Sequence, residues 1–284
     1  MQRREFEVRL PHLRLSACSW GNPSLPPLLA LHGWLDNAAS FDRLAPLLAD
    51  HFHVVALDLP GHGQSDWRAP GAWYHFVDYP DDVLAAADAL GLQQFGLLGH
   101  SLGGAIASVF AAICPRRVDR LLLIEALGPL AADAENSLQQ WQRALIERQR
   151  HADKQLRVFA ARDDAVAARM QANGLSRDAA ELLISRGLKK VDGGFIWSTD
   201  PRLTLTSPLR LTESQVCAVL SGIQVPTLLI GALPGAAYQQ RETIRNRAAL
   251  IKRIDIRQLP GSHHLHLEDA QPVAAAILEF VASG

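Results

Sequence analysis

The stretch F-G-L-L-G-H-S-L-G-G, residues 95–104, decides the fold. An apolar run ends at Gly99, Ser101 follows, and small apolar side chains continue to Cys114, where Pro115 stops the segment. A G-x-S-x-G pentapeptide between a strand and a helix is typical of a nucleophile elbow, a strained turn that projects the serine hydroxyl from a sheet. The pattern alone is weak, but the context that it requires is present. Ser101 is therefore the candidate nucleophile.

The sequence on either side of this turn predicts an α/β protein. Uninterrupted apolar runs, which suit strands buried on both faces of a parallel sheet, cover residues 27–31, 53–58, 95–99 and 120–124. Helical segments at residues 79–91 and 101–114 lie between them. This alternation predicts right-handed βαβ crossovers and an open, doubly wound sheet with helices on both faces.

The remaining segments complete the sheet. Residues 6–10 and 12–20 predict an antiparallel hairpin at a sheet edge. Late in the chain, residues 225–231 and 254–259 predict two more strands, and a last helix is expected at residues 269–282.

A helical insertion separates the two parts of the core. From about residue 130 to residue 222 there is no convincing strand run. Helix starts occur instead, because Ser137 with Gln140 and Thr212 with Gln215 each fit a capping box. We therefore expect a core formed by residues 1–128 and 223–284, with residues 129–222 as a helical cap.

Composition excludes several classes of function. Lys and Arg number 28 against 29 for Asp and Glu, so there is no basic footprint for nucleic acid or an anionic membrane. Cys18, Cys114 and Cys217 are too few and too widely spaced for a disulfide framework, which suits a reducing compartment. The start lacks a signal-peptide pattern, and no apolar run could span a membrane. We expect a cytoplasmic monomer or homodimer that binds a small-molecule substrate.

A serine nucleophile needs a general base, and three histidines after the last strand compete for that role. His263 directly follows a Pro-Gly-Ser turn and is the preferred base. His264 is the alternative, whereas His266 falls where the last helix begins and fits packing or the surface better. No acidic or cysteine ligand spacing accompanies these histidines, so we expect neither a metal nor a cofactor.

The oxyanion donors should be backbone N–H groups, one after the nucleophile and one in the loop after an earlier strand. These would be the N–H groups of Leu102 and Trp34. Gly33 permits the tight turn that this loop needs. His32 fits a structural hydrogen-bonding role better than that of a second base.

Several motifs carry a resemblance to a known family. H-G-W at residues 32–34, D-L-P-G-H-G-Q-S at residues 58–65 and G-H-S-L-G-G at residues 99–104 resemble the α/β-hydrolase superfamily. More narrowly, residues 32–44, 74–79 and 186–203 resemble the serine hydrolase-like proteins. The resemblance implies a sheet of about eight strands with a helical cap inserted after the sixth.

The acid of the expected triad departs from the common pattern. Most members of the superfamily place it after the seventh strand, but here A-L-P-G-A-A-Y, residues 232–238, contains no carboxylate. A variant arrangement in the superfamily places the acid at the end of the sixth strand, where Glu125 stands. A carboxylate that ends an aliphatic run is costly unless it is paired, so Glu125 is the predicted acid. Its alternative role is a structural carboxylate bonded to backbone amides, and Asp255 and Asp58 are weaker candidates.

The identity of the nucleophile restricts the chemistry. Dehalogenases and epoxide hydrolases on this fold resemble one another in using aspartate at the elbow, whereas Ser101 indicates acyl transfer. A small or medium, apolar carboxylic ester is the expected substrate. A C–C or amide hydrolase, a perhydrolase on the same triad, and a non-catalytic ligand-binding protein stay open.

Aromatic side chains in the core and the cap could line the substrate pocket. For Trp141 and Phe159, packing is favoured over a pocket role. The candidates are Trp34, Trp141, Phe159 and Phe195.

Overall fold

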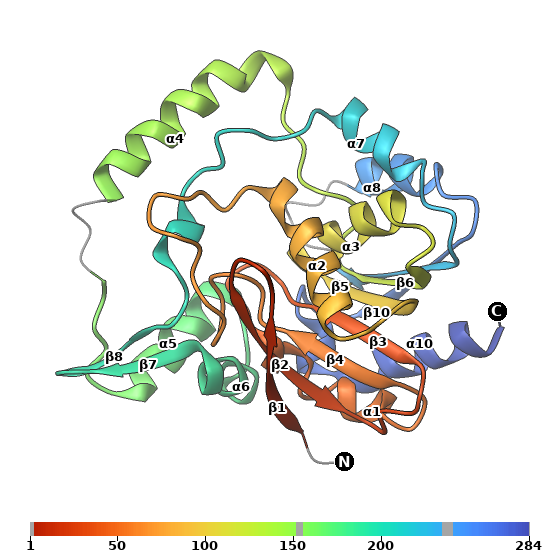
Figure 1. Ribbon diagram of the computed structural model, residues 1–284, viewed down its shortest axis with the longest axis horizontal. Helices are drawn as coiled ribbons and strands as arrows, with labels where there is room; N and C mark the ends of the chain where they lie inside the picture. Colours follow the sequence, from red (N-terminus) through yellow and green to blue (C-terminus); the bar gives the residue numbers. More distant parts are fainter. Residues whose placement is uncertain (1–2, 152–155, 235–240, 284) are drawn as a thin grey trace.

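An eight-stranded sheet forms the centre of the computed structural model, which describes residues 3–151, 156–234 and 241–283 (Figure 1). Across the sheet, the strands are β1 (Arg4–Arg9), β2 (Arg14–Trp20), β4 (His53–Leu57), β3 (Pro27–Leu31), β5 (Phe95–His100), β6 (Val118–Ile124), β9 (Thr227–Leu233) and β10 (Ile254–Pro260). β2 is antiparallel to β1 and to β4, and the six strands from β4 to β10 are mutually parallel. The predicted sheet and its edge hairpin are confirmed.

Helices cover both faces of the sheet because its central strands are apolar on both sides. Alternate residues of a strand point to opposite faces, so Leu28 and Leu29 of β3 belong to different core clusters. On one face lie α2 (Tyr79–Ala89), α3 (Leu102–Ile113), α7 (Glu213–Leu220) and α8 (Arg241–Ala248). On the other face lie α1 (Ala45–Leu48) and α10 (Ala270–Ser283).

The segment between β6 and β9 is mostly helical. Its elements are η3 (Ala134–Asn136), α4 (Ser137–His151), α5 (Arg162–Asn173), α6 (Arg177–Gly187), β7 (Leu188–Val191), β8 (Gly194–Trp197), η4 (Pro201–Thr204) and α7. α5 and α6 build a separate apolar cluster around Val166, Leu183 and Ile184. α7 packs Val216 and Leu220 into the cluster under α3. The exact division of the chain into core and cap stays a prediction.

One expectation about this insertion is wrong, because β7 and β8 form a two-stranded antiparallel sheet. The turn between them contains Gly193 at φ +83 and leads to Gly194 at φ +145, conformations that glycine adopts without strain. A Cβ on Gly194 would lie 2.0 Å from the Phe159 carbonyl oxygen, because Phe159 pairs with Phe195 across a β-bridge. The D-G-G turn at residues 192–194 was the available signal.

The two predicted helix caps have different outcomes. Thr212 and Gln215 form the expected capping box at the start of α7. Ser137 does not cap α4, because it is the first helical residue and its hydroxyl donates to the Ala134 carbonyl at 2.6 Å. A short 3-10 turn, η3, directly precedes α4, so Ser137 lies inside the helix and not at the capping position before it. Within the described ranges, no helix is long and apolar enough to cross a membrane.

Candidate active site

Ser101 lies at the junction between β5 and α3, at the carboxyl edge of the parallel strands. Its backbone has φ +51 and ψ −114, a strained conformation for a residue with a side chain. The Ser101 N–H donates to the Ile124 carbonyl of β6 at 3.0 Å, and the Gly103 N–H donates to the His32 carbonyl at 3.0 Å. The neighbouring strands therefore hold the turn in the geometry of a nucleophile elbow.

Glycines allow α3 to approach the sheet closely behind this turn. A Cβ on Gly103 would lie 2.0 Å from the Leu31 carbonyl oxygen of β3. A Cβ on Gly99 would lie 2.4 Å from the Gly103 carbonyl oxygen. Both obstacles are backbone atoms, which cannot move aside as a side chain could. The elbow thus depends on the absence of side chains at these two positions.

Glu125 and His263 meet beside the elbow. Glu125 directly follows β6 and has φ +55, and its side chain is 3% exposed. Its Oε1 accepts a hydrogen bond from the Ala232 N–H at 2.6 Å, and its Oε2 lies 3.2 Å from His263 Nδ1. A carboxylate at Nδ1 favours the tautomer in which Nε2 carries the lone pair that a general base requires. The structure brings together the acid and the base that the sequence predicts.

The other two histidines of this segment have different neighbours. His264 is buried, and its Nε2 lies 3.2 Å from Asp36 Oδ2. His266 is also buried, and its Nε2 lies 2.8 Å from the Ser40 hydroxyl. Burial, reinforced by the nearby His264, lowers the pKa of His266 to about 3, so this ring is neutral at pH 7.

The weaker acid candidates are occupied elsewhere. Asp58 accepts hydrogen bonds from the Ala38 N–H at 2.7 Å and the Gln64 N–H at 2.8 Å, and it forms a buried ion pair with Arg186. Asp255 forms an ion pair with Arg257 at 3.1 Å. Asp58 therefore organises the loop after β4, and Asp255 belongs to a partly exposed pair on β10.

The predicted oxyanion donors come from two adjacent loops. Among the residues that the structure describes, neither the Trp34 N–H nor the Leu102 N–H has a hydrogen-bond acceptor. A tight turn, in which the Asp36 N–H donates to the Gly33 carbonyl at 3.1 Å, orients the first loop. Leu35 within this turn has φ +61. Unsatisfied N–H groups beside a serine nucleophile are the donors that a developing oxyanion requires.

His32 is buried against the same loop, and both of its ring nitrogens make hydrogen bonds to the backbone. Its Nδ1 lies 2.7 Å from the Gly33 carbonyl oxygen, and its Nε2 accepts a hydrogen bond from the Leu59 N–H at 3.0 Å. Burial lowers the pKa of His32 to about 4, so the ring is neutral at pH 7. These contacts agree with a structural role for His32.

The predicted pocket aromatics lie in different surroundings. Phe159 is buried in the cluster of α5 and α6, with its ring centroid 5.0 Å from that of Trp197. Trp141 on α4 is 47% exposed, so the packing interpretation is wrong for it. α4 stands away from the sheet (Figure 1). Phe195 is half-buried, and the Trp34 indole N–H donates to the Leu203 carbonyl at 3.0 Å.

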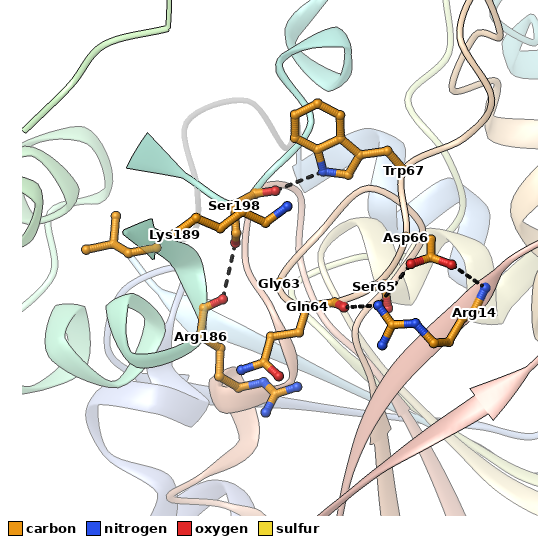
Figure 2. A pocket seen from close by; sticks show the side chains of 10 residues that line it. Arg14, Gly63, Gln64, Ser65, Asp66, Trp67, Arg186, Lys189 and Ser198 are labelled. Carbon is orange, nitrogen blue, oxygen red and sulfur yellow. Dashed lines mark hydrogen bonds and ion pairs between the residues drawn. The ribbon is translucent and has the colours of Figure 1, made fainter. Parts of the chain in front are cut away.

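A cavity of about 250 Å³ lies away from these residues, between the loop after β4 and the β7–β8 hairpin (Figure 2). Its lining is formed by Arg14, residues 63–67, Arg186, Leu188, Lys189 and Ser198. Arg14 is paired with Glu7 and Asp66. Ser101, Glu125 and His263 do not line this cavity, so it is distinct from the candidate active site.

Two buried charged residues near the site, Asp36 and Arg169, form an ion pair that the sequence did not predict. Asp36 lies two residues after Trp34 in the loop of residues 33–36, called the oxyanion loop below after its predicted donor, and Arg169 lies on α5. A signal for Asp36 was available, since it is an acidic residue inside a stretch that resembles the family. No local pattern distinguished Arg169 from the other charges of the insertion.

Comparison with known proteins gives a consistent result. A family model described as the alpha/beta hydrolase fold matches residues 26–269. Human serine hydrolase-like protein 2 is 32% identical, with 98% of this chain and 93% of that protein covered. A mouse serine hydrolase-like protein is also 32% identical, over 98% of this chain and 95% of that protein.

Solved structures agree with these sequence relatives. A hypothetical protein from Pseudomonas aeruginosa PAO1 superimposes with a TM-score of 0.93 at 43% identity, covering 98% of this chain and 99% of that one. A thioesterase domain from the curacin biosynthetic pathway has a TM-score of 0.85 at 27% identity, and the match covers 98% of this chain and 100% of that domain.

Proposed function

The chain belongs to the α/β-hydrolase fold family, and we propose that it is a serine hydrolase that cleaves a small or medium, apolar carboxylic ester. Ser101 is the nucleophile, His263 the general base and Glu125 the acid. The observation that carries this proposal is the 3.2 Å contact between Glu125 Oε2 and His263 Nδ1 beside the elbow. A carboxylate at this position orients the imidazole for proton transfer, which catalysis requires and a ligand-binding role does not.

The reaction proceeds through an acyl-enzyme. His263 Nε2 takes the proton of the Ser101 hydroxyl as the serine oxygen attacks the ester carbonyl. The N–H groups of Trp34 and Leu102 stabilise the negative charge that develops on the carbonyl oxygen. The tetrahedral intermediate collapses, and His263 returns the proton to the leaving alcohol. A water molecule, activated by the same imidazole, then hydrolyses the acyl-enzyme and releases the acid.

Glu125 assists these reaction steps by stabilising the imidazolium that forms on His263. Its carboxylate is buried, and the Ala232 N–H fixes one of its oxygens. The other oxygen faces His263 Nδ1 and keeps the ring in the required orientation. The acid acts from the end of β6, which explains why none is needed in the segment after β9.

Two lines of support favour acyl substrates. The elbow carries serine, which forms acyl esters that water can hydrolyse. The structurally similar curacin protein is a thioesterase domain, so thioesters belong in a substrate panel for this chain beside oxygen esters. The same triad could serve a C–C or amide hydrolase or a perhydrolase, because the leaving group is selected by the residues around the triad.

A small fluorophosphonate tests the proposal without a known substrate. Intact mass should show one adduct, and peptide mapping should place it on Ser101. The Ser101→Ala and His263→Ala variants should not be labelled, whereas Ser214→Ala, which changes an exposed serine of α7, should be labelled like the wild type. A folded wild-type protein that takes no adduct would contradict the proposed function.

A further inference from the structure

Asp36 is a buried carboxylate that the mechanism above does not use. Its side chain is 1% exposed and belongs to the loop that presents the Trp34 N–H. Oδ1 contacts the guanidinium of Arg169 on α5, and Oδ2 lies 3.2 Å from His264 Nε2. The carboxylate of Asp36, which lies in the oxyanion loop, therefore contacts both the helical insertion and the segment that carries the proposed base, His263.

The neighbouring imidazole of His100 extends this network to His263. His100 Nε2 lies 2.9 Å from the His263 carbonyl oxygen, to which it donates, and His100 Nδ1 lies 3.7 Å from Asp36 Oδ2. A Cβ on Gly33 would lie 2.9 Å from both Asp36 Oδ2 and His100 Nδ1, so the loop approaches the pair closely. The His263 carbonyl and the His264 side chain are thus both held.

His264 and Arg169 together stabilise the charge of Asp36. Burial alone would raise the pKa of Asp36, but His264 and Arg169 outweigh it and hold the pKa well below its usual range. Burial, with the neighbouring histidines, lowers the pKa of His100 well below its usual value, so His100 is neutral at pH 7. Removing the guanidinium would leave a buried carboxylate without its fixed positive partner, which is strongly unfavourable.

We propose that Asp36 and Arg169 are positioning residues that couple the helical insertion to the catalytic site. Arg169 holds Asp36, and Asp36 holds both the oxyanion loop and the His263–His264 segment. The geometry of base and oxyanion donors then depends on how α5 docks against the core. This inference rests on the proposed function, but it concerns residues that do not touch the reacting atoms.

A metal ion is the competing explanation for the same cluster. One ligand atom from each of Asp36, His100 and His264 lies within 4.8 Å of the others, and all three residues are buried. Arg169 already contacts one oxygen of the carboxylate, so a metal ion would place a second cation beside the guanidinium. We therefore assign the positive charge of this cluster to the arginine.

The experiment compares Arg169→Met, Arg169→Lys and Arg177→Met by the second-order rate of fluorophosphonate labelling at Ser101, measured well below the unfolding temperature. Arg177 is a matched control, because it lies on α6, is 52% exposed, and pairs with Asp163 and Glu181 within the insertion. Arg169→Met should lower the rate about 10- to 100-fold, as expected for misplaced catalytic groups. Arg169→Lys should recover most of the loss, and Arg177→Met should stay within about twofold of the wild type.

Hydrogen–deuterium exchange of residues 261–269 provides a readout that does not depend on catalysis. Exchange there should become faster in Arg169→Met and stay unchanged in Arg177→Met. If Arg169→Met does not fold, Asp36→Asn, which removes the charge at constant shape, replaces it in both measurements.

The outcomes distinguish the positioning role of Asp36 and Arg169 from the proposed hydrolase function. Wild-type labelling at Ser101 with an equal rate in folded Arg169→Met would overturn the positioning role and leave the proposed function intact. A wild-type protein that is not labelled would contradict the proposed function, and the exchange measurement alone would then decide the network. A labelling rate that EDTA abolishes and Zn²⁺ restores would overturn the assignment in favour of a metal.

Discussion

Glu125 Oε2 and His263 Nδ1 lie 3.2 Å apart although the two residues are separated by 138 positions in the chain. Glu125 reaches this position from the end of β6, where its N–H donates to the Ile230 carbonyl at 2.8 Å and its other oxygen accepts from the Ala232 N–H. β9 thereby supplies backbone support for an acid that another strand carries. The pairing supports the proposal that Glu125 is the acid in place of a carboxylate in the segment after β9.

Removing members of the proposed triad should not give additive losses. Ser101→Ala and His263→Ala should each abolish most turnover of an ester, because nucleophile and base act in the same step. The double variant should be little slower than either single variant. Initial rates with a chromogenic ester check this, and losses that multiply in the double variant would contradict the assignment.

Glu125→Gln should leave the fold intact and lower kcat by several orders of magnitude, on the order of 10⁴-fold where the wrong tautomer is stabilised. The amide keeps the shape of the side chain but does not stabilise the imidazolium on His263. Thermal unfolding and ester turnover are the two measurements. Glu279→Gln, which alters an exposed pair with Arg257, is the control and should keep its activity. Near-normal turnover of Glu125→Gln would show that the acid is elsewhere.

Gly103→Ala should disrupt the elbow. The added Cβ would lie 2.0 Å from the Leu31 carbonyl oxygen, so α3 or β3 must move. We expect a loss of at least about 2 kcal/mol in unfolding free energy and the loss of labelling at Ser101. Gly187→Ala is the control, because its Cβ would make an ordinary 3.5 Å contact with Asn37. Equal urea midpoints for the two variants would refute the close-packing argument.

Stability should fall as the pH decreases from about 6.5 towards 4. Burial lowers the pKa of His62 to about 3, of His266 to about 3 and of His32 to about 4, from an ordinary value of 6.5. In this range the unfolded chain binds protons that the native protein does not, so each histidine destabilises the fold by up to about 1.4 kcal/mol per pH unit.

Urea unfolding at pH 7, 6 and 5 measures this dependence. His266→Asn should reduce the slope, and a change at the exposed His51, such as His51→Gln, should not. A free energy of unfolding that is constant between pH 7 and 5 would mean that these rings take up protons in the native protein as readily as in the unfolded chain.

Local patterns predicted most of the sheet because strand burial and turn chemistry are properties of short segments. The runs at residues 27–31 and 95–99 are apolar on both faces, and the structure places them side by side at the centre. The hairpin of β7 and β8 escaped because its strands have four residues each and no fully buried position. Such strands carry little hydrophobic pattern, so only their D-G-G turn could have revealed them.

The sequence by itself determined the elbow at Ser101, the parallel sheet that carries it and the candidates for base and acid, because spacing, glycine positions and apolar runs act over a few residues. Only the tertiary structure decided that His263 rather than His264 faces Glu125, and that Asp36 lies between His264 and Arg169. The pairs Asp36–Arg169 and Asp36–His264 are 133 and 228 positions apart in the chain. Contacts of this kind depend on how the insertion and the strand ends pack together, and no local pattern of residues specifies that packing.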